Sequence, residues 1–323
     1  MSKISVIVAI YGVEKYIEKC AISLFNQTFD DLEYIFVDDY TPDNSIDILL
    51  NVIEKYGVKD KVTILHHDKN YGLPAARNTG LSHATGDYVS FIDSDDWIEK
   101  DMYSQLYQYA MVNNCDCVYC GYAKENKSET EIHYQECSKT KNVLDNVKDL
   151  LIGKSDMYIW NKLIKKSIFA ENLISFPGGY DMWEDMSVTV QIAYYAKQIG
   201  VVNKPLYHYR VNENSISLVL SQKQINAMIR NLNFIEFFLR SIRASEIMSS
   251  YLLRCKFFVK DAYIALHGDV SGWFSLYPEV NEFVWEQKTC WYIKFYEWGL
   301  VKHNKCIYSL YQICRRMKNC LKR

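Results

Sequence analysis

The sequence predicts an α/β protein whose mainly parallel sheet is covered by helices and is followed by a helical C-terminal region. Over the first hundred residues, short apolar runs of strand length alternate with segments that repeat at helical spacing. This alternation is typical of a parallel sheet that helices bury on both faces. From about residue 218 the apolar residues recur at spacings of three and four, which indicates helices.

The predicted elements follow one another in a regular order. Strands are expected at residues 4–10, 34–38, 62–65 and 87–92, with helices near 17–24, 45–53 and 74–84. A looser continuation follows, with a helix near 101–113, a strand over CDCVYCGY, a helix near 143–152, a helix over SVTVQIAYYA and a short strand over KPLYHYR. We therefore predict one domain over residues 1–217 and a helical region over 218–323.

The composition excludes several classes of protein. The chain has 323 residues, 49% of them hydrophobic, and a net charge of −2, so its global charge does not point to a nucleic-acid partner. Its ten cysteines are scattered through a long chain, unlike those of a small disulfide scaffold. No apolar run reaches the roughly 18 residues that span a bilayer. The N-terminal run ISVIVAI is expected to be a buried strand rather than a signal sequence, so we expect a cytoplasmic location.

Carboxylates gather where two of the predicted strands end. Asp38 and Asp39 follow the second strand, and Asp93, Asp95 and Asp96 follow the fourth. Ligands of parallel α/β sheets bind beyond the carboxyl ends of the strands, and carboxylate oxygens are the ligands that Mg²⁺ and Mn²⁺ prefer. The pair Asp93 and Asp95 therefore indicates a divalent-cation site. The alternative for each cluster is a solvated acidic turn that caps the next helix.

A basic residue lies just before the fourth strand, in the segment NYGLPAARNTG, which contains Arg77. A guanidinium presents a fork of donors that fits a phosphate or the edge of a base. Arg77 is therefore a candidate ligand-binding residue. The alternative is an ion pair with one of the nearby aspartates, and the two roles are compatible.

These segments together resemble a known family. The pieces SVIVAIYG, VDDYTPDNS, NYGLPAARNTGL and GDYVSFIDSDDW match, in order and spacing, the inverting family-2 glycosyltransferases with the GT-A fold. The resemblance covers residues 4–97 and continues more weakly, through WNKLIKKSIF, WEDM and LYHYRVNENSIS, to about residue 217. The sequence departs from the family around Tyr11, where proline, valine and asparagine are usual. It departs again at Tyr40, a bulky residue where glycine gives a free turn.

The resemblance implies a nucleotide-sugar donor, most often a UDP-sugar. Tyr11 would border the base, Asp39 would accept a hydrogen bond from uracil, and Arg77 would hold the base or the diphosphate. The implied donor contacts are Ala9, Tyr11, Asp38, Asp39, Arg77, Asp93, Ser94, His208 and Arg210.

The resemblance also implies Mn²⁺ or Mg²⁺ as cofactor. Asp95 would be its main ligand, Asp93 would lie beside the metal and the ribose, and His208 is a candidate third ligand. The alternative for His208 is a satisfied histidine in a buried aromatic strand. The metal would stabilise the charge on the departing nucleotide as a Lewis acid.

Inverting transfer also needs a base that takes the proton of the acceptor hydroxyl. The family places an acidic pair here, and Glu184-Asp185 follow the Pro-Gly-Gly break at residues 177–179. We expect Asp185 to be the base, with Glu184 second. The alternative is that these charges only favour the dipole of the helix that begins there. Trp160 and Lys162 are expected either to line the acceptor or phosphate region or to serve as core packing and surface charge.

The sequence thus predicts a metal-dependent inverting glycosyltransferase. It would move a sugar to a hydroxyl of a glycan or lipid-linked saccharide in the biosynthesis of bacterial surface polysaccharide. One rival is a sugar-nucleotide nucleotidyltransferase, although YGVEKY is a poor substitute for the Gly-rich basic loop that such an enzyme needs. The other rival is a non-catalytic module that binds nucleotide or glycan.

The end of the chain has a composition that favours a membrane surface. From Leu300 to Arg323 there are seven Lys or Arg and no Asp or Glu, with apolar residues along one helical face. Such a helix is attracted to anionic lipid, which predicts peripheral membrane contact through residues 300–323. The alternative is a final helix that packs on its own domain.

Overall fold

The structure is a computed structural model that describes residues 2–126, 129–136, 142–151, 154–179, 182–211, 221–286, 290–302, 306–307 and 309. The chain divides into two compact units, Met1–Val219 and Leu220–Arg323. The first unit contains all of the residues that were predicted to form a site.

The first unit is built on one sheet, which has nine strands in the part of the chain that is described. They are β1 (Ile4–Ile10), β2 (Leu32–Asp38), β3 (Val62–His66), β4 (Tyr88–Asp93), β5 (Trp97–Ile98), β6 (Cys117–Glu125), β7 (Thr130–His133), β8 (Lys162–Lys165) and β9 (Ile199–Arg210). Their order is β3-β2-β1-β4-β8-β6-β9-β5, with β7 beside β6. The strands β1 to β4 pair in parallel, whereas β8 is antiparallel to both of its neighbours. The predicted α/β sheet is confirmed, and its second half is mixed.

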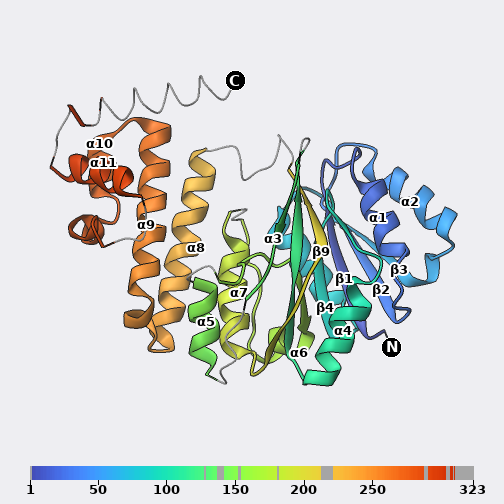
Figure 1. Cartoon of the computed structure of the whole chain (residues 1–323). Helices are drawn as coiled ribbons and strands as arrows, with labels where there is room; N and C mark the ends of the chain where they lie inside the picture. Colours follow the sequence, from blue (N-terminus) through green and yellow to red (C-terminus); the bar gives the residue numbers. More distant parts are fainter. Residues whose placement is uncertain are drawn as a thin grey trace. The chain divides into compact units, whose positions relative to one another are not determined.

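Helices cover both faces of this sheet (Figure 1). The helices of the first unit are α1 (Ile17–Phe25), α2 (Ser45–Tyr56), α3 (Leu73–His83), α4 (Met102–Asn113), α5 (Val143–Leu151), α6 (Lys166–Glu171) and α7 (Glu184–Tyr195). Val6 and Val8 of β1 belong to a core cluster with buried side chains of α1, α2 and α4. Between them, Ile7 points to the other face and contacts Gly80 of α3, where an added Cβ would lie 2.4 Å from Ile7 Cγ2. Gly80 therefore sets the close approach of α3 to the sheet.

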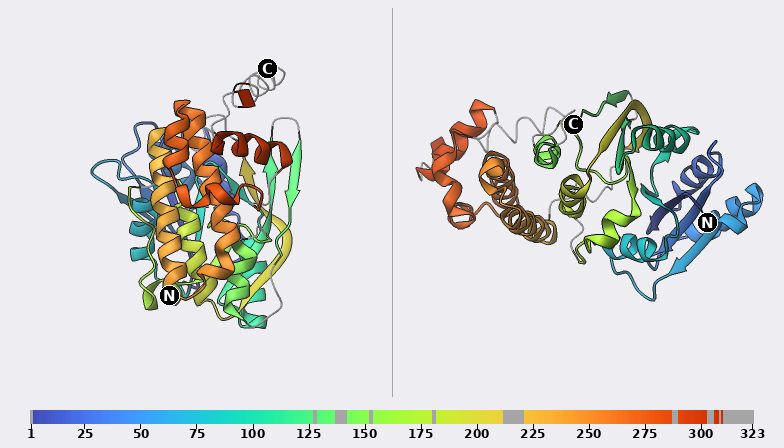
Figure 2. Two further views of the ribbon diagram at one scale, coloured as in Figure 1. Left: turned by 90° about the vertical axis from the view of Figure 1, so that its left-hand side faces the viewer. Right: turned by 90° about the horizontal axis from the view of Figure 1, so that it is seen from below.

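The second unit is helical, as predicted. It contains α8 (Gln222–Ser241), α9 (Ser245–His267), α10 (Val270–Ser275) and α11 (Trp291–Val301). The long helices α8 and α9 run side by side, as both views of Figure 2 show. A separate core holds Leu253, Phe257, Ile264, Trp273, Val280, Val284, Tyr296 and Leu300.

A membrane-spanning helix is not found among the described residues, because no helix there is both long and apolar enough to cross a bilayer. The predicted membrane contact through residues 300–323 falls largely outside the described part of the chain.

Candidate active site

The sheet register brings the carboxyl ends of three strands together. Ala9 of β1 pairs with Asp93 of β4 on one side and with Val37 of β2 on the other. Ile10 pairs with Asp38, so the acidic ends of β2 and β4 flank the end of β1. The apolar runs thus fix the register, and the register gathers Ala9, Asp38 and Asp93 at one edge of the sheet.

Arg77 joins this edge to the helix α7. Its side chain is only 4% exposed, and its Nη2 donates to Asp93 Oδ1 at 2.9 Å. Its Nη1 donates to Glu184 Oε1 at 3.1 Å and to Asp185 Oδ1 at 2.5 Å. Burial disfavours the charge of Arg77, but the three carboxylates overcome this and raise its pKa. The predicted ion pair of Arg77 with a nearby aspartate is confirmed. Arg77 also pairs with two further carboxylates, so it links two acidic clusters that lie about ninety residues apart in the sequence.

Asp185 is held at both of its carboxylate oxygens. Oδ1 accepts from Arg77, and Oδ2 accepts from the backbone N–H of Ile159 at 3.1 Å. The residue before the acidic pair, Trp183, has a left-handed backbone with φ of 66°. Such conformations cost of order 1 kcal/mol and are concentrated at functional sites. The start of α7 is therefore positioned by its surroundings rather than by local preference.

The two carboxyl groups at the start of α7 differ in their environment. Burial raises the pKa of Glu184 to about 8, and the neighbouring Asp185 adds to this effect. Glu184 is 7% exposed, so its neutral form is favoured near neutral pH. Asp185, in contrast, has both of its carboxylate oxygens held by N–H donors.

The protonation of Glu184 makes a testable prediction about stability. The pKa of Glu184 is about 8 in the folded chain, whereas its usual value is 4.5. The contribution of Glu184 to the free energy of unfolding is therefore fully present below pH 4.5 and is lost as the pH rises towards 8. Glu184→Gln keeps the neutral form, so the melting temperature of the variant relative to wild type should rise with pH between 5 and 8. The expected difference in the free energy of unfolding is about 1–3 kcal/mol over that range. Glu18→Gln, which removes an exposed carboxylate, is the control. A Glu184→Gln difference that does not change with pH would show that Glu184 is ionised throughout.

The turn after β4 places its three aspartates in different surroundings. Asp96 is 1% exposed, and it accepts hydrogen bonds from the Tyr207 hydroxyl at 2.6 Å and the Arg210 N–H at 2.7 Å. Burial raises the pKa of Asp96 well above its usual range. Asp96 thus fixes the turn from within, whereas Asp93 and Asp95 are half-buried.

The donor set at this turn fits a divalent cation that also binds a ligand. Within the described ranges no group of three or more His, Cys, Asp or Glu side chains is arranged to hold a metal alone. Two carboxylates, those of Asp93 and Asp95, are what a Mg²⁺ site usually takes from the protein when phosphates and water supply the rest. Burial raises the pKa of Asp93, and Arg77 opposes this only in part, so a cation would relieve the crowding of negative charge.

His208, the candidate third metal ligand, lies between two glutamate side chains. Its Nδ1 lies 2.8 Å from Glu125 Oε1, and its Nε2 lies 2.9 Å from Glu99 Oε1. The ring stacks on Trp97 with the centroids 5.0 Å apart. Both ring nitrogens have carboxylate partners, as the satisfied-histidine alternative expects, and metal or donor binding by His208 stays a prediction.

Arg210 lies next to the turn that follows β4. Its Nε donates to the backbone carbonyl of Asp95 at 2.9 Å, and its guanidinium lies over the rings of Tyr16 and Trp97. The Nζ atom of Lys19 lies 3.0 Å from the centroid of the Trp97 ring. Positive charge is therefore fixed beside the turn, although Lys19 was not singled out in the sequence.

The predicted nucleotide contacts on β1 and β2 divide into exposed and buried residues. Tyr11 is 51% exposed at the end of β1. Asp39 is 2% exposed, and its carboxylate accepts from the N–H groups of Tyr71 and Gly72, both at 2.8 Å, and pairs with His67. Asp39 therefore holds the loop that leads into α3 and Arg77. Its predicted contact with uracil stays a prediction.

The remaining predicted residues have structural contacts. Asp38 accepts from the Thr41 N–H at 2.8 Å and pairs with His66, and Ser94 is buried. Tyr40 has φ of 60° and is exposed, so a bulky residue does occupy the left-handed turn position.

Lys162 is not a surface charge. It is fully buried, and its Nζ donates to the backbone carbonyls of Asp156 and Tyr158 and to the side chain of Asn161. Burial lowers its pKa to about 8. Lys162 thus shapes the loop before β8, which carries the Ile159 N–H that binds Asp185.

Comparison with known proteins identifies the class of this fold and site. The family model described as Glycosyl transferase family 2 matches residues 5–173. The chain therefore belongs to glycosyl transferase family 2, and its sheet and helices have the GT-A arrangement.

Individual relatives agree with this family. The chain is 36% identical over 218 residues to the putative glycosyltransferase EpsH of Bacillus subtilis, which covers 66% of this chain and 62% of that protein. It is 30% identical to the poly(ribitol-phosphate) beta-glucosyltransferase of Bacillus spizizenii over 76% of this chain and 37% of that protein. The chain thus spans less than two thirds of the length of either relative.

Solved structures agree with the fold. The crystal structure of S. aureus TarS 1–349 superposes with a TM-score of 0.69 at 20% identity, over 96% of this chain and 91% of that one. The complex of the same protein with UDP gives a TM-score of 0.60 at 22% identity, over 87% and 78%.

Proposed function

We propose that the chain is a metal-dependent inverting glycosyltransferase that moves a sugar from a UDP-sugar to a hydroxyl of a glycan or lipid-linked saccharide. The observation that carries this proposal is the Arg77 network, which brings the strand-end Asp93 and the helix-start pair Glu184-Asp185 into one site. A metal-dependent inverting transferase needs a cation side and a base side at one anomeric carbon, and the contacts of Arg77 with Asp93 and Asp185 support this arrangement. Membership of family 2 supports the reaction class, and the UDP bound to TarS supports a uridine donor.

The donor side of the proposed site lies at the carboxyl ends of β1, β2 and β4. The exposed ring of Tyr11 is available to the base, and Arg210 offers positive charge to the diphosphate. Asp95 and Asp93 would hold a divalent cation, which when bound supplies Lewis-acid stabilisation of the charge on the departing UDP. Arg77 keeps Asp93 in place and does not itself need to reach the ligand.

The acceptor side lies at the start of α7. The acceptor hydroxyl attacks the anomeric carbon opposite the nucleotide, and Asp185 takes its proton as the new carbon–oxygen bond forms. The bond from that carbon to the diphosphate oxygen breaks, and its electron pair leaves with UDP, so the anomeric configuration inverts. The contacts of Asp185 with Arg77 and the Ile159 N–H orient its carboxylate.

The biological setting is part of the same proposal. The poly(ribitol-phosphate) beta-glucosyltransferase among the relatives supports a role in the assembly of bacterial surface polymers. The basic composition of residues 300–323 supports peripheral contact with the cytoplasmic face of the membrane.

A donor screen tests the proposed function. The full chain is incubated with UDP-glucose, UDP-galactose, UDP-N-acetylglucosamine, UDP-N-acetylgalactosamine and UDP-glucuronic acid, each with Mn²⁺ or Mg²⁺, and released UDP is measured. We expect release above the no-enzyme control with at least one donor, even as slow hydrolysis, and loss of release with EDTA. Pyrophosphate as the product would instead indicate a nucleotidyltransferase. Tight UDP binding without turnover of any donor, across a broad set of acceptors, would indicate a binding module.

A further inference from the structure

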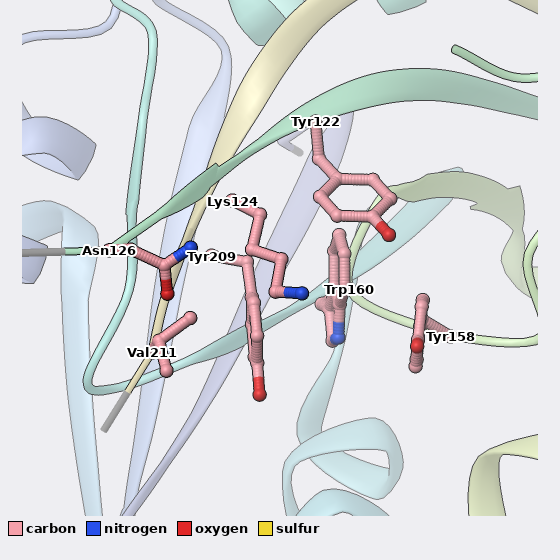
Figure 3. A pocket seen from close by; sticks show the side chains of 7 residues that line it. All are labelled: Tyr122, Lys124, Asn126, Tyr158, Trp160, Tyr209 and Val211. Carbon is pink, nitrogen blue, oxygen red and sulfur yellow. The ribbon is translucent and has the colours of Figure 1, made fainter. Parts of the chain in front are cut away.

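The first unit contains an aromatic pocket that lies outside the proposed metal, nucleotide and base residues. Its lining residues are Tyr122, Lys124, Asn126, Tyr158, Trp160, Tyr209 and Val211. Figure 3 shows their side chains converging from β6, from the loop before β8 and from the end of β9. The cavity measures about 340 Å³, which is within the range of sites for small molecules.

The rings of the pocket form an ordered stack. Trp160 is 3% exposed and lies flat against Tyr207 with centroids 4.3 Å apart. Tyr158 is parallel to Trp160 within 12° at 4.8 Å, and Tyr209 is parallel to it within 7° at 5.9 Å. Tyr122 meets Trp160 edge-on at 87°. The buried indole therefore fixes the rings around it, while Tyr158 remains 45% exposed.

The pocket is tied directly to the proposed active site. Tyr158 and Trp160 flank Ile159, whose N–H binds Asp185 at 3.1 Å. Tyr207, on which Trp160 stacks, donates its hydroxyl proton to Asp96 in the turn that follows β4. A ligand in the pocket would thus be held by the same loop that aims the proposed base.

The sheet order places this pocket away from Tyr11 and Asp39, the residues predicted to contact the nucleobase of the donor. Its β6 and β9 residues lie beyond β4 and β8, whereas Tyr11 and Asp39 lie at the ends of β1 and β2 on the other side of β4. The nucleotide and the occupant of the pocket would then approach Asp93 from opposite sides. This arrangement suits the two substrates of a transferase.

The chemistry of the pocket fits a neutral sugar. Flat tyrosine rings pack against the apolar C–H face of a pyranose, and phenol, amide and ammonium groups bond its hydroxyls. Lys124 is already paired with Glu131 at 3.6 Å, so its charge is offset. Asp156 adds to the effect of burial in raising the pKa of the Tyr158 phenol. The negative charge of Asp156 near Tyr158 disfavours an anionic ligand in the pocket.

We propose that the aromatic pocket is an acceptor subsite that binds a neutral pyranose residue against the ring of Tyr158. Binding itself follows from the rings and the polar groups around them. The assignment to the acceptor rests on the proposed transferase function.

Saturation-transfer NMR on the full chain tests this proposal without requiring turnover. The probes are methyl β-D-glucopyranoside, methyl β-D-galactopyranoside and methyl N-acetyl-β-D-glucosaminide, each added alone, and UDP with Mg²⁺. We expect transfer to the protons of one pyranose face for at least one glycoside, reduced about 5–10-fold in Tyr158→Ala. Tyr158→Phe should restore the signal, because it keeps the ring. Tyr292→Ala is the control, since Tyr292 lies in the second unit with a similar exposure of 49%.

Each outcome bears on the proposal separately from the donor screen. If none of the glycosides gives a signal with wild type, or if Tyr158→Ala binds them equally well, the subsite is wrong even if UDP is released in the screen. A loss of uracil signals in Tyr158→Ala would show that the pocket holds the nucleobase, which also overturns the proposal. Glycoside binding together with a negative donor screen would keep the sugar site and reject the transferase.

Discussion

Arg77→Met is expected to lower the free energy of unfolding by about 3–5 kcal/mol, because it removes the guanidinium that pairs with the buried carboxylates. Asp93, Glu184 and Asp185 all lose a donor at hydrogen-bonding distance. Arg77→Lys should recover only part of the loss, since an ammonium cannot reproduce the forked contacts of a guanidinium. Thermal and urea unfolding of the full chain measure the change.

A matched control separates this network from ordinary ion pairs. Lys165 pairs with Asp116 at 2.8 Å and is 33% exposed, so Lys165→Met should cost at most about 1 kcal/mol. The deficit of Arg77→Met should also shrink as the pH falls, because burial raises the pKa of Asp93 and favours its neutral form. A loss for Arg77→Met no larger than that for Lys165→Met would mean that the network does not hold the two halves of the site together.

Asp185→Asn is expected to reduce sugar transfer about 10²–10⁴-fold, because a positioned general base contributes that much to the rate. The fold should be retained, since an amide oxygen can still accept from the Ile159 N–H. Glu184→Gln is the matched variant and should lose less, because Glu184 is favoured as the neutral form. The reverse order of the two losses would assign the base to Glu184.

The fold was predictable because its signals are local. The runs ISVIVAI and YVSFI are mostly apolar, as strands buried on both faces are. Parallel pairing of β1 with β2 and β4 brings the carboxyl ends of these strands to one edge of the sheet, so the proximity of Asp38 and Asp93 could be predicted from the sequence. The burial of individual apolar residues was harder to predict, because Leu50 of α2 is 48% exposed whereas Val52 is buried.

The contacts that shape the candidate site could not be predicted, because they depend on how distant elements pack. Arg77 and Asp185 are 108 residues apart, and their contact requires α3 and the start of α7 to meet. The surroundings of His208 could not be predicted either, because the sequence does not show that Glu99 and Glu125 flank its ring. The Ile159 N–H left no sequence signal at all, since every residue but proline has one.

The aromatic pocket had only a partial signal. The density of tyrosine, 26 residues in the chain, indicated rings that suit sugars or a core. Which rings are parallel and which are exposed is decided by the β6–β9 pairing and by the burial of Lys162 beneath the loop. Pocket shape therefore needed the structure.

The most direct test of the two-sided site is a calorimetric titration of UDP in the presence of Mn²⁺ into Asp95→Asn and Asp185→Asn. Removing a carboxylate from the cation side should weaken UDP binding about tenfold or more, as the loss of a ligand-binding charge does. Removing the proposed base should leave UDP affinity within about threefold of wild type while transfer is lost. If Asp95→Asn binds UDP as wild type does, or if Asp185→Asn loses UDP binding to the same extent, the division of the site into a cation side and a base side is wrong.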